Sequence, residues 1–162
     1  MLLLDPELEM DPWTEAYLYA AARADLVRRE ILPHLQRGGI VLCERFLDSS
    51  LAYQGAGRGL GIAAVRELNA WAVEQVRPDL TFYLRLSSEE RARRAREAGT
   101  TPDRIEKVGE EFMRRVEKGF EQIARSEPGR IRVLNAALLP ENLARIVGQE
   151  ILEKWSVARG NV

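Results

Sequence analysis

The chain has very few of the side chains on which cysteine or histidine chemistry depends. It contains one cysteine, Cys43, and one histidine, His34, in 162 residues. A single cysteine excludes a disulfide framework within the chain and favours a cytoplasmic location. Cys43 falls in a short apolar run and His34 near the end of a predicted helix, so both are interpreted as structural. Neither a Ser-His-Asp triad nor a metal-binding cluster is indicated.

Long apolar runs and an excess of one charge are also missing. No apolar stretch approaches the roughly 18 residues of a membrane-spanning helix, and the leucines after Met1 run directly into acidic residues, unlike a secretion signal. The formal net charge is −1, so no bulk electrostatic field points to a nucleic acid or a membrane as partner. A hydrophobic content of 46% fits a globular protein. The length fits a single domain over residues 1–162.

Helical and strand patterns alternate along the chain. Asp11-Pro12 is typical of a helix start, and this helix is predicted to reach about Gln36, with a bend near Pro33 and an end at Gly38-Gly39. Strands are predicted at 40–43, 80–86 and 131–134, and further helices at 62–76, from Ser87 or Ser88, at about 103–125 and at 140–155. Strands separated by helices indicate an α/β fold with a parallel sheet.

The most informative residues follow the first predicted strand. Glu44 and Arg45 stand where that apolar run ends, and ligands bind at the carboxyl ends of strands in open α/β sheets. An arginine there, followed by hydroxyl, amide and phenol groups, suits a planar anionic ligand that forms hydrogen bonds, such as a nucleotide. The alternative is a surface ion pair, which contributes little to stability.

A flexible glycine loop is predicted over 55–61, where glycine stands at every second position. Glycine permits close approach of a ligand to the backbone, although a plain turn would look similar. The spacing fails the G-x-G-x-x-G pattern from every starting glycine, so NAD or FAD binding is not indicated.

Two further groups of residues suit a nucleotide. Tyr19 and Arg23 are four apart and share a helix face, where a phenol ring could stack on a base and a guanidinium could donate to its carbonyl. The arginines Arg93, Arg94 and Arg96 could close over a phosphate. The alternatives are ordinary packing for the pair and a solvated helix face for the arginines.

The residues Glu44-Arg45-Phe46, with Asp48 through Gly55, closely resemble the signature of bacterial thymidylate kinases. These enzymes phosphorylate dTMP with ATP and magnesium. The similarity continues through Leu18–Arg23, Arg77–Leu80 and Asp103–Glu106. It implies a P-loop-kinase-like three-layer fold with a parallel sheet, a kinase that makes dTDP for dTTP synthesis, ATP and Mg²⁺ as requirements, and a homodimer.

The resemblance also implies a role for each matching residue at the base. Tyr19 matches the aromatic residue that stacks on thymine, and Arg23 matches the arginine that bonds to thymine O4. Ser50 and Gln54 match polar contacts to the base edge. Tyr53 matches the ring beneath the deoxyribose, which disfavours a ribose 2′-hydroxyl.

At the phosphate, Arg45 matches the arginine that holds the dTMP phosphate. Glu44 stands where the family commonly has Asp, near magnesium and the phosphates, and is therefore expected to act on magnesium indirectly. Arg93, Arg94 and Arg96 fall in or beside a lid at about residues 91–106, where one arginine reaches the transferring phosphate.

The resemblance does not include a P-loop. Kinases of this family begin with a strand and a G-x-x-x-x-G-K-[ST]-type loop, whereas no lysine follows a glycine in this sequence. The first strand and the Walker A loop are thus expected to be absent from this chain, with Met1 an internal or mis-called start. The alternatives are a non-catalytic dTMP-binding remnant and another nucleotide kinase of the same fold.

Overall fold

The computed structural model of the chain describes residues 9–74, 76–98 and 109–159. These residues form two compact units, each of which is described by itself. The helical unit contains the described residues up to Arg77 together with 109–126, and the strand unit contains those of 78–98 and 127–159. The expectation of one domain stays a prediction.

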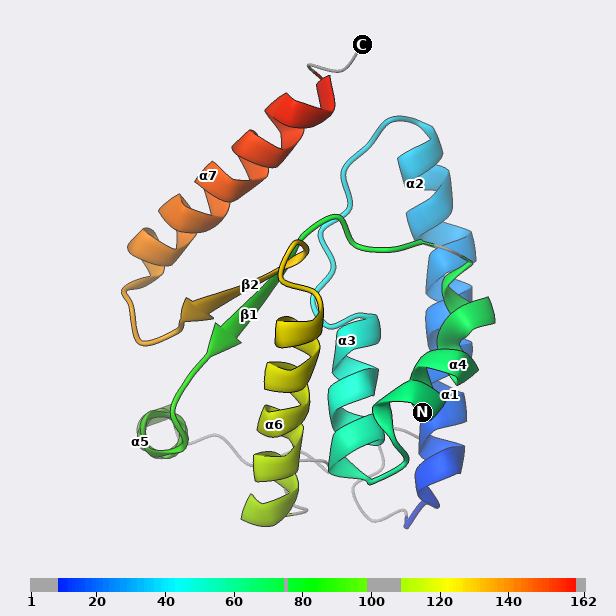
Figure 1. The fold of residues 1–162 in the computed structure, drawn as a ribbon, viewed down its shortest axis with the longest axis vertical. Coiled ribbons are helices and arrows are strands. Elements are labelled where there is room, and N and C mark those ends of the chain that lie inside the picture. Colours follow the sequence, from blue (N-terminus) through cyan, green and yellow to red (C-terminus); the bar gives the residue numbers. More distant parts are fainter. Residues whose placement is uncertain (1–8, 75, 99–108, 160–162) are drawn as a thin grey trace. The chain divides into compact units, whose positions relative to one another are not determined.

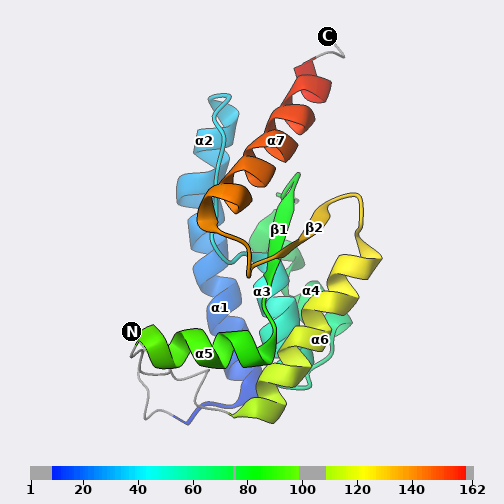
Figure 2. The ribbon, with the colours of Figure 1, turned by 90° about the vertical axis from the view of Figure 1, so that its left-hand side faces the viewer.

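The helical unit is built from helices of the first part of the chain and one helix from later in the chain (Figures 1 and 2). In chain order its elements are α1 (Pro12–Leu26), the π-helical η2 (Val27–Ile31), α2 (Leu32–Gln36), α3 (Leu47–Ser50), the π-helical η3 (Leu51–Gly57), α4 (Ile62–Val73) and α6 (Glu110–Ser126).

The predicted first helix is confirmed. The Asp11 side chain caps it, accepting hydrogen bonds from the backbone N–H groups of Trp13 at 2.9 Å and Thr14 at 3.3 Å. Near Pro33 the helix changes to π-helical turns over Val27–Ile31. Proline lacks an N–H, and its ring crowds the carbonyl four residues earlier. A local π-helical segment relieves this crowding. Gly38, with φ of 78°, follows the end of α2.

The core of the helical unit lies where η3 packs against α6 and α4. Its buried apolar side chains include Leu51, Ala52, Val65, Phe112, Val116 and Ile123. Glycine permits the close packing: a Cβ atom at Gly119 of α6 would lie 2.6 Å from the Ala56 Cβ atom of η3. The two helices therefore approach more closely than larger residues would allow.

The predicted glycine loop is wrong in its first half. Gly55 and Gly57 lie inside η3 and are buried. A Cβ atom at Gly57 would lie 2.7 Å from the side chains of Phe112 and Val116, so this glycine serves packing rather than flexibility. The second half of the prediction holds: Gly59 and Gly61, with φ of 78° and 91°, turn the chain into α4.

The strand predicted at 40–43 is not formed among the described residues. This segment is extended, but it has no hydrogen-bonded neighbour in the described sheet, and Leu42 is 91% exposed. A strand needs a partner for its N–H and C=O groups, so an apolar pattern alone does not make one.

The strand unit contains the parallel pair that the sequence predicts. Its elements are β1 (Thr81–Arg85), α5 (Ser88–Ala98), β2 (Ile131–Asn135) and α7 (Pro140–Arg159). Thr81 pairs with Ile131 and Arg85 with Asn135. Ser87 caps α5 by accepting a hydrogen bond from the Glu90 N–H at 3.2 Å, as expected. Parallel strands connected through helices confirm the α/β class.

Two predicted helices have different limits. The helix predicted at 62–76 ends at Val73, because Glu74 takes the left-handed conformation with φ of 46°. The helix predicted at 103–125 is described from Glu110 to Ser126, and the predicted break at 99–102 lies outside the described residues. No helix in the described part of the chain is long and apolar enough to cross a membrane.

Candidate functional site

One face of α1 carries three of the side chains on which the site depends. Glu15, Tyr19 and Arg23 follow one another at intervals of four residues and therefore share a side of the helix. Glu15 is fully buried and Arg23 is 8% exposed, while Tyr19 is half-buried. The first and last of the three contact α3 and η3, as the hydrogen bonds below describe.

Arg23 meets Ser50, as the sequence led us to expect for two residues of one site. Arg23 Nη2 donates to Ser50 Oγ at 2.7 Å and to the Phe46 carbonyl oxygen at 3.3 Å. The guanidinium also lies 5.6 Å from the centre of the Phe46 ring. Burial lowers the pKa of Arg23, while Cys43 and Asp48 act in the opposite direction.

Asn69 of α4 is a further partner of Arg23 that the sequence did not indicate. Its Oδ1 accepts from Arg23 Nη1, and its Nδ2 donates to the Val65 carbonyl oxygen at 2.8 Å. The bond to Val65 fixes the amide with its oxygen toward the arginine. A guanidinium has more N–H groups than these contacts use, so Arg23 retains donors for a ligand.

Gln54 is held by Glu15, a buried acid of α1 that the sequence did not indicate. Gln54 Nε2 donates to Glu15 Oε1 at 2.9 Å. Arg58 binds both carboxylate oxygens of Glu15, through Nε at 3.3 Å and Nη2 at 2.8 Å. The Arg58 guanidinium lies 5.1 Å from the centre of the Phe112 ring. Burial of a paired acid and arginine beside an amide is typical of a structured polar site.

Arg45 and Tyr53 also come together. The Arg45 guanidinium lies 5.3 Å from the centre of the Tyr53 ring, within the range of a cation–π contact. The ring is fixed from other sides by Phe112 and Phe120, with centres 6.2 and 6.1 Å away. Arg45 is exposed and has φ of 60°. Glu44, its neighbour, is also exposed.

The predicted lid arginines belong to the strand unit. On α5, Arg93 pairs with Glu90 and Glu97, each at 2.6 Å, and Arg94 pairs with Glu90 at 3.0 Å. Hydrogen bonds from Arg93 and Arg94 lower the pKa of Glu90 to about 2. Arg96 is exposed. The part of the predicted lid from 99 to 106 lies outside the described residues.

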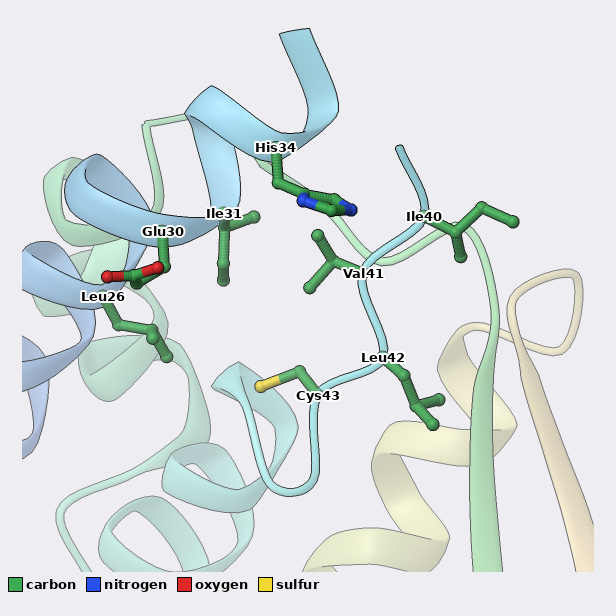
Figure 3. Close-up of a pocket in the computed structure, with 8 residues that line it drawn as sticks. All are labelled: Leu26, Glu30, Ile31, His34, Ile40, Val41, Leu42 and Cys43. Atoms are coloured by element: carbon green, nitrogen blue, oxygen red, sulfur yellow. The ribbon is translucent and has the colours of Figure 1, made fainter. Parts of the chain in front are cut away.

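A pocket of about 310 Å³ lies between the end of the first helical stretch and the segment 40–43 (Figure 3). Val41 and Cys43 point toward the helix, whereas Ile40 and Leu42 point away from it. This alternation is that of an extended chain. Burial raises the pKa of the Cys43 thiol, and Arg23 opposes the shift. Most of the lining residues are of apolar types and none is a predicted substrate residue, so we do not assign the substrate to this pocket.

The described residues contain no group of three or more His, Cys, Asp or Glu side chains that could hold a metal ion. Magnesium, however, commonly uses one or two carboxylates together with substrate phosphates and water. Glu44, exposed beside Arg45, fits such a partial role.

Comparisons with known proteins agree on one family. Residues 1–147 match the family model described as thymidylate kinase. The thymidylate kinase of Enterococcus faecalis is 44% identical over 156 residues, which cover 95% of this chain and 74% of that protein. The thymidylate kinase of Pelotomaculum thermopropionicum is 47% identical over 137 residues, which cover 84% of this chain and 63% of that protein.

A solved structure gives the same result. The structure of thymidylate kinase from Ehrlichia chaffeensis matches 91% of this chain and 68% of its own, with a TM-score of 0.69 and 27% sequence identity. The chain thus spans between about three fifths and three quarters of the length of these relatives. On the family model, the sequence relatives and the shared fold, the chain belongs to the thymidylate kinase family.

Proposed function

We propose that the chain acts in the ATP-dependent phosphorylation of dTMP to dTDP, a step of dTTP synthesis. The observation that carries this proposal is the pairing of α1 with α3 and η3. Arg23 meets Ser50 at 2.7 Å, and Gln54 is held one helical turn further along. Family membership supplies the reaction, and the paired residues supply a site with the polarity of a pyrimidine base.

In this proposal the base lies against the α1 face. The Tyr19 ring stacks on thymine, and Arg23 donates to the O4 carbonyl, which a guanidinium with remaining N–H groups can do. Ser50 and Gln54 contact the base edge. Tyr53, whose ring is fixed by Phe112 and Phe120, lies beneath the deoxyribose and disfavours a 2′-hydroxyl.

The phosphate of dTMP is assigned to Arg45. Phosphoryl transfer depends on positioning and on stabilising negative charge more than on covalent catalysis. The Arg45 guanidinium lies 5.3 Å from the centre of the Tyr53 ring, and Arg45 is exposed, so an anion in solution can reach it. Glu44 is assigned to magnesium, which would neutralise phosphate charge when it is bound with ATP. One of Arg93, Arg94 and Arg96 is assigned to the transferring phosphate.

Assembly and location complete the proposal. The family resemblance supports a homodimer, which light scattering of the purified chain would test. A cytoplasmic location fits a soluble nucleotide kinase, and nucleic acids and membranes are not expected partners.

The proposal predicts that Arg45→Ala abolishes most use of dTMP while leaving the fold intact. Removing a charge-assisted phosphate contact costs about 1.5–3 kcal/mol, which corresponds to roughly ten- to hundredfold weaker binding. Calorimetry with dTMP and a coupled assay for ADP with MgATP would measure the effect. Arg37→Ala, which removes an exposed arginine from the same unit, is the matched control and should change neither quantity.

The same experiments separate the alternatives. Binding of dTMP without turnover in the presence of MgATP would indicate a non-catalytic binding protein. A preference for another monophosphate in a panel of deoxy- and ribonucleotides would indicate a different kinase of the fold. Equal loss of helical signal and of binding in Arg45→Ala would make Arg45 a structural residue.

A further inference from the structure

We propose that Glu15 is a positioning residue that fixes the side-chain amide of Gln54 and thereby sets, together with Arg23, which pyrimidine the site accepts. The inference rests on the proposed function, because it takes Gln54 as a contact to the base edge. The resemblance on which that function is based assigns no role to Glu15. Its role is inferred from its own buried contacts.

The contact with Glu15 fixes the orientation of the Gln54 amide. Glu15 is fully buried and Gln54 is 2% exposed. The Glu15 carboxylate, paired through both oxygens with Arg58, can only accept hydrogen bonds. The amide must therefore turn its nitrogen toward Glu15, as the Nε2–Oε1 distance of 2.9 Å reflects. The opposite orientation would place two oxygens together in a buried site, at a cost of about 1–3 kcal/mol.

This orientation leaves the carbonyl oxygen of Gln54 available to a ligand. The carbonyl oxygen of Gln54 is directed away from Glu15 and is an acceptor. Thymine and uracil carry an N–H at ring position 3, which such an oxygen can accept. Cytosine carries an unprotonated nitrogen at that position, which would face the oxygen lone pair to lone pair. At this edge of the base, cytosine would be accommodated only after the Gln54 amide rotated, and rotation would break the hydrogen bond of the amide to Glu15.

Glu15 lies in line with the other residues proposed to contact the base. Glu15 lies four residues before Tyr19 on one face of α1, and Gln54 lies four residues after Ser50. The contacts Arg23–Ser50 and Glu15–Gln54 thus form two successive cross-links between the same helices. Glu15 fixes one end of the proposed base site, as Arg23 fixes the other.

The test uses the full chain and the variant Glu15→Gln, which keeps the size of the side chain. A neutral amide at position 15 can donate as well as accept, so the Gln54 amide is free to rotate. We expect the ratio of the dTMP and dCMP affinities, measured by calorimetry, to fall roughly tenfold or more. The affinity for dCMP should rise in absolute terms, which simple damage to the site would not produce.

The matched control is Glu67→Gln, the same exchange at an exposed residue of α4 in the same unit. This variant should keep the dTMP preference of the wild type. A Glu15→Gln variant that loses affinity for both nucleotides by the same factor would overturn the inference and make Glu15 purely structural.

A second measurement does not depend on nucleotide binding. In the ¹⁵N-labelled chain, the side-chain NH₂ resonances of Gln54 should shift in Glu15→Gln and much less in Glu67→Gln. Unchanged Gln54 resonances in Glu15→Gln would overturn the inference even with a wild-type chain that binds no dTMP. Failure of the wild-type chain to bind dTMP would instead count against the proposed function.

Discussion

Among single residues, Asn69 connects the site to the core of the helical unit. It is fully buried, accepts from Arg23 and donates to the Val65 carbonyl. Asn69→Ala would leave a buried N–H donor of the Arg23 guanidinium without its acceptor. It would also leave a cavity where the Asn69 amide was. We expect the free energy of unfolding to fall by about 1–3 kcal/mol, as measured by urea denaturation.

The control for this prediction is Gln122→Ala, which changes an exposed amide on α6 of the same unit. Its effect should stay within about 0.5 kcal/mol. A loss in Asn69→Ala no larger than that of the control would show that Arg23 is satisfied without Asn69. The predicted loss should be accompanied by weaker dTMP binding, since Arg23 would no longer be fixed.

The residues of the site divide according to how far away their partners lie in the sequence. Tyr19, Arg23, Ser50, Tyr53 and Gln54 were proposed from a local motif. The partners Glu15, Arg58 and Asn69 were not, because their contacts join residues 39, 43 and 46 positions apart. One signal was available: Glu15 lies at helical spacing from Tyr19 and Arg23, on the face already assigned to the ligand.

At the scale of elements, the contact between α6 and η3 depends on Gly119. A Cβ atom there would lie 2.6 Å from the Ala56 Cβ atom and 3.2 Å from the Ala52 Cα atom. Alanine is more favourable than glycine inside a helix by about 0.5–1 kcal/mol, but overpacking a core costs about 1–3 kcal/mol. Gly119→Ala should therefore destabilise the chain by about 1–2 kcal/mol in urea denaturation.

Gly148→Ala in α7 is the matched control, because nothing lies within 4 Å of the Cβ atom that it adds. The propensity gain should act alone there, and thermal stability of α7 should rise slightly or stay the same. A stabilising effect at position 119 would show that the two helices can move apart at little cost, contrary to the packing described above.

Elements were predictable where their signals are local. The Asp11 cap with Pro12 and the Ser87 cap are complete within four residues, and both were found where the sequence placed them. The strand at 40–43 was wrong because pairing depends on a neighbour that an apolar run does not specify. Gly57 was mistaken for a loop residue because its reason, the approach of Phe112 and Val116, lies more than 50 residues away.

At the scale of the whole molecule, the two units differ in how much core they have. Every buried apolar side chain of the described core except Ile131 belongs to the helical unit. The strand unit contains two paired strands, and its Leu84 and Val133 side chains are 52% and 50% exposed. A two-stranded sheet is marginal unless further packing supports it.

We therefore predict that amide hydrogen exchange separates the units. The backbone N–H groups of β1 and β2 should lose protection at lower urea concentration than those of η3 and α6, because local opening follows the amount of buried apolar contact. Mass spectrometry of peptides after exchange would measure this. Equal protection in both units at every urea concentration would mean that they unfold as one.

Because Arg45 has a left-handed backbone, selection for heat resistance and selection for activity should favour different residues at position 45. A residue with a Cβ atom at φ of 60° is held against a steric preference, and such strain amounts to about 1–3 kcal/mol. Asparagine or glycine would adopt that conformation more easily. A library screened for heat resistance should therefore drift toward those residues at position 45, whereas one screened for growth that requires the kinase activity should keep arginine.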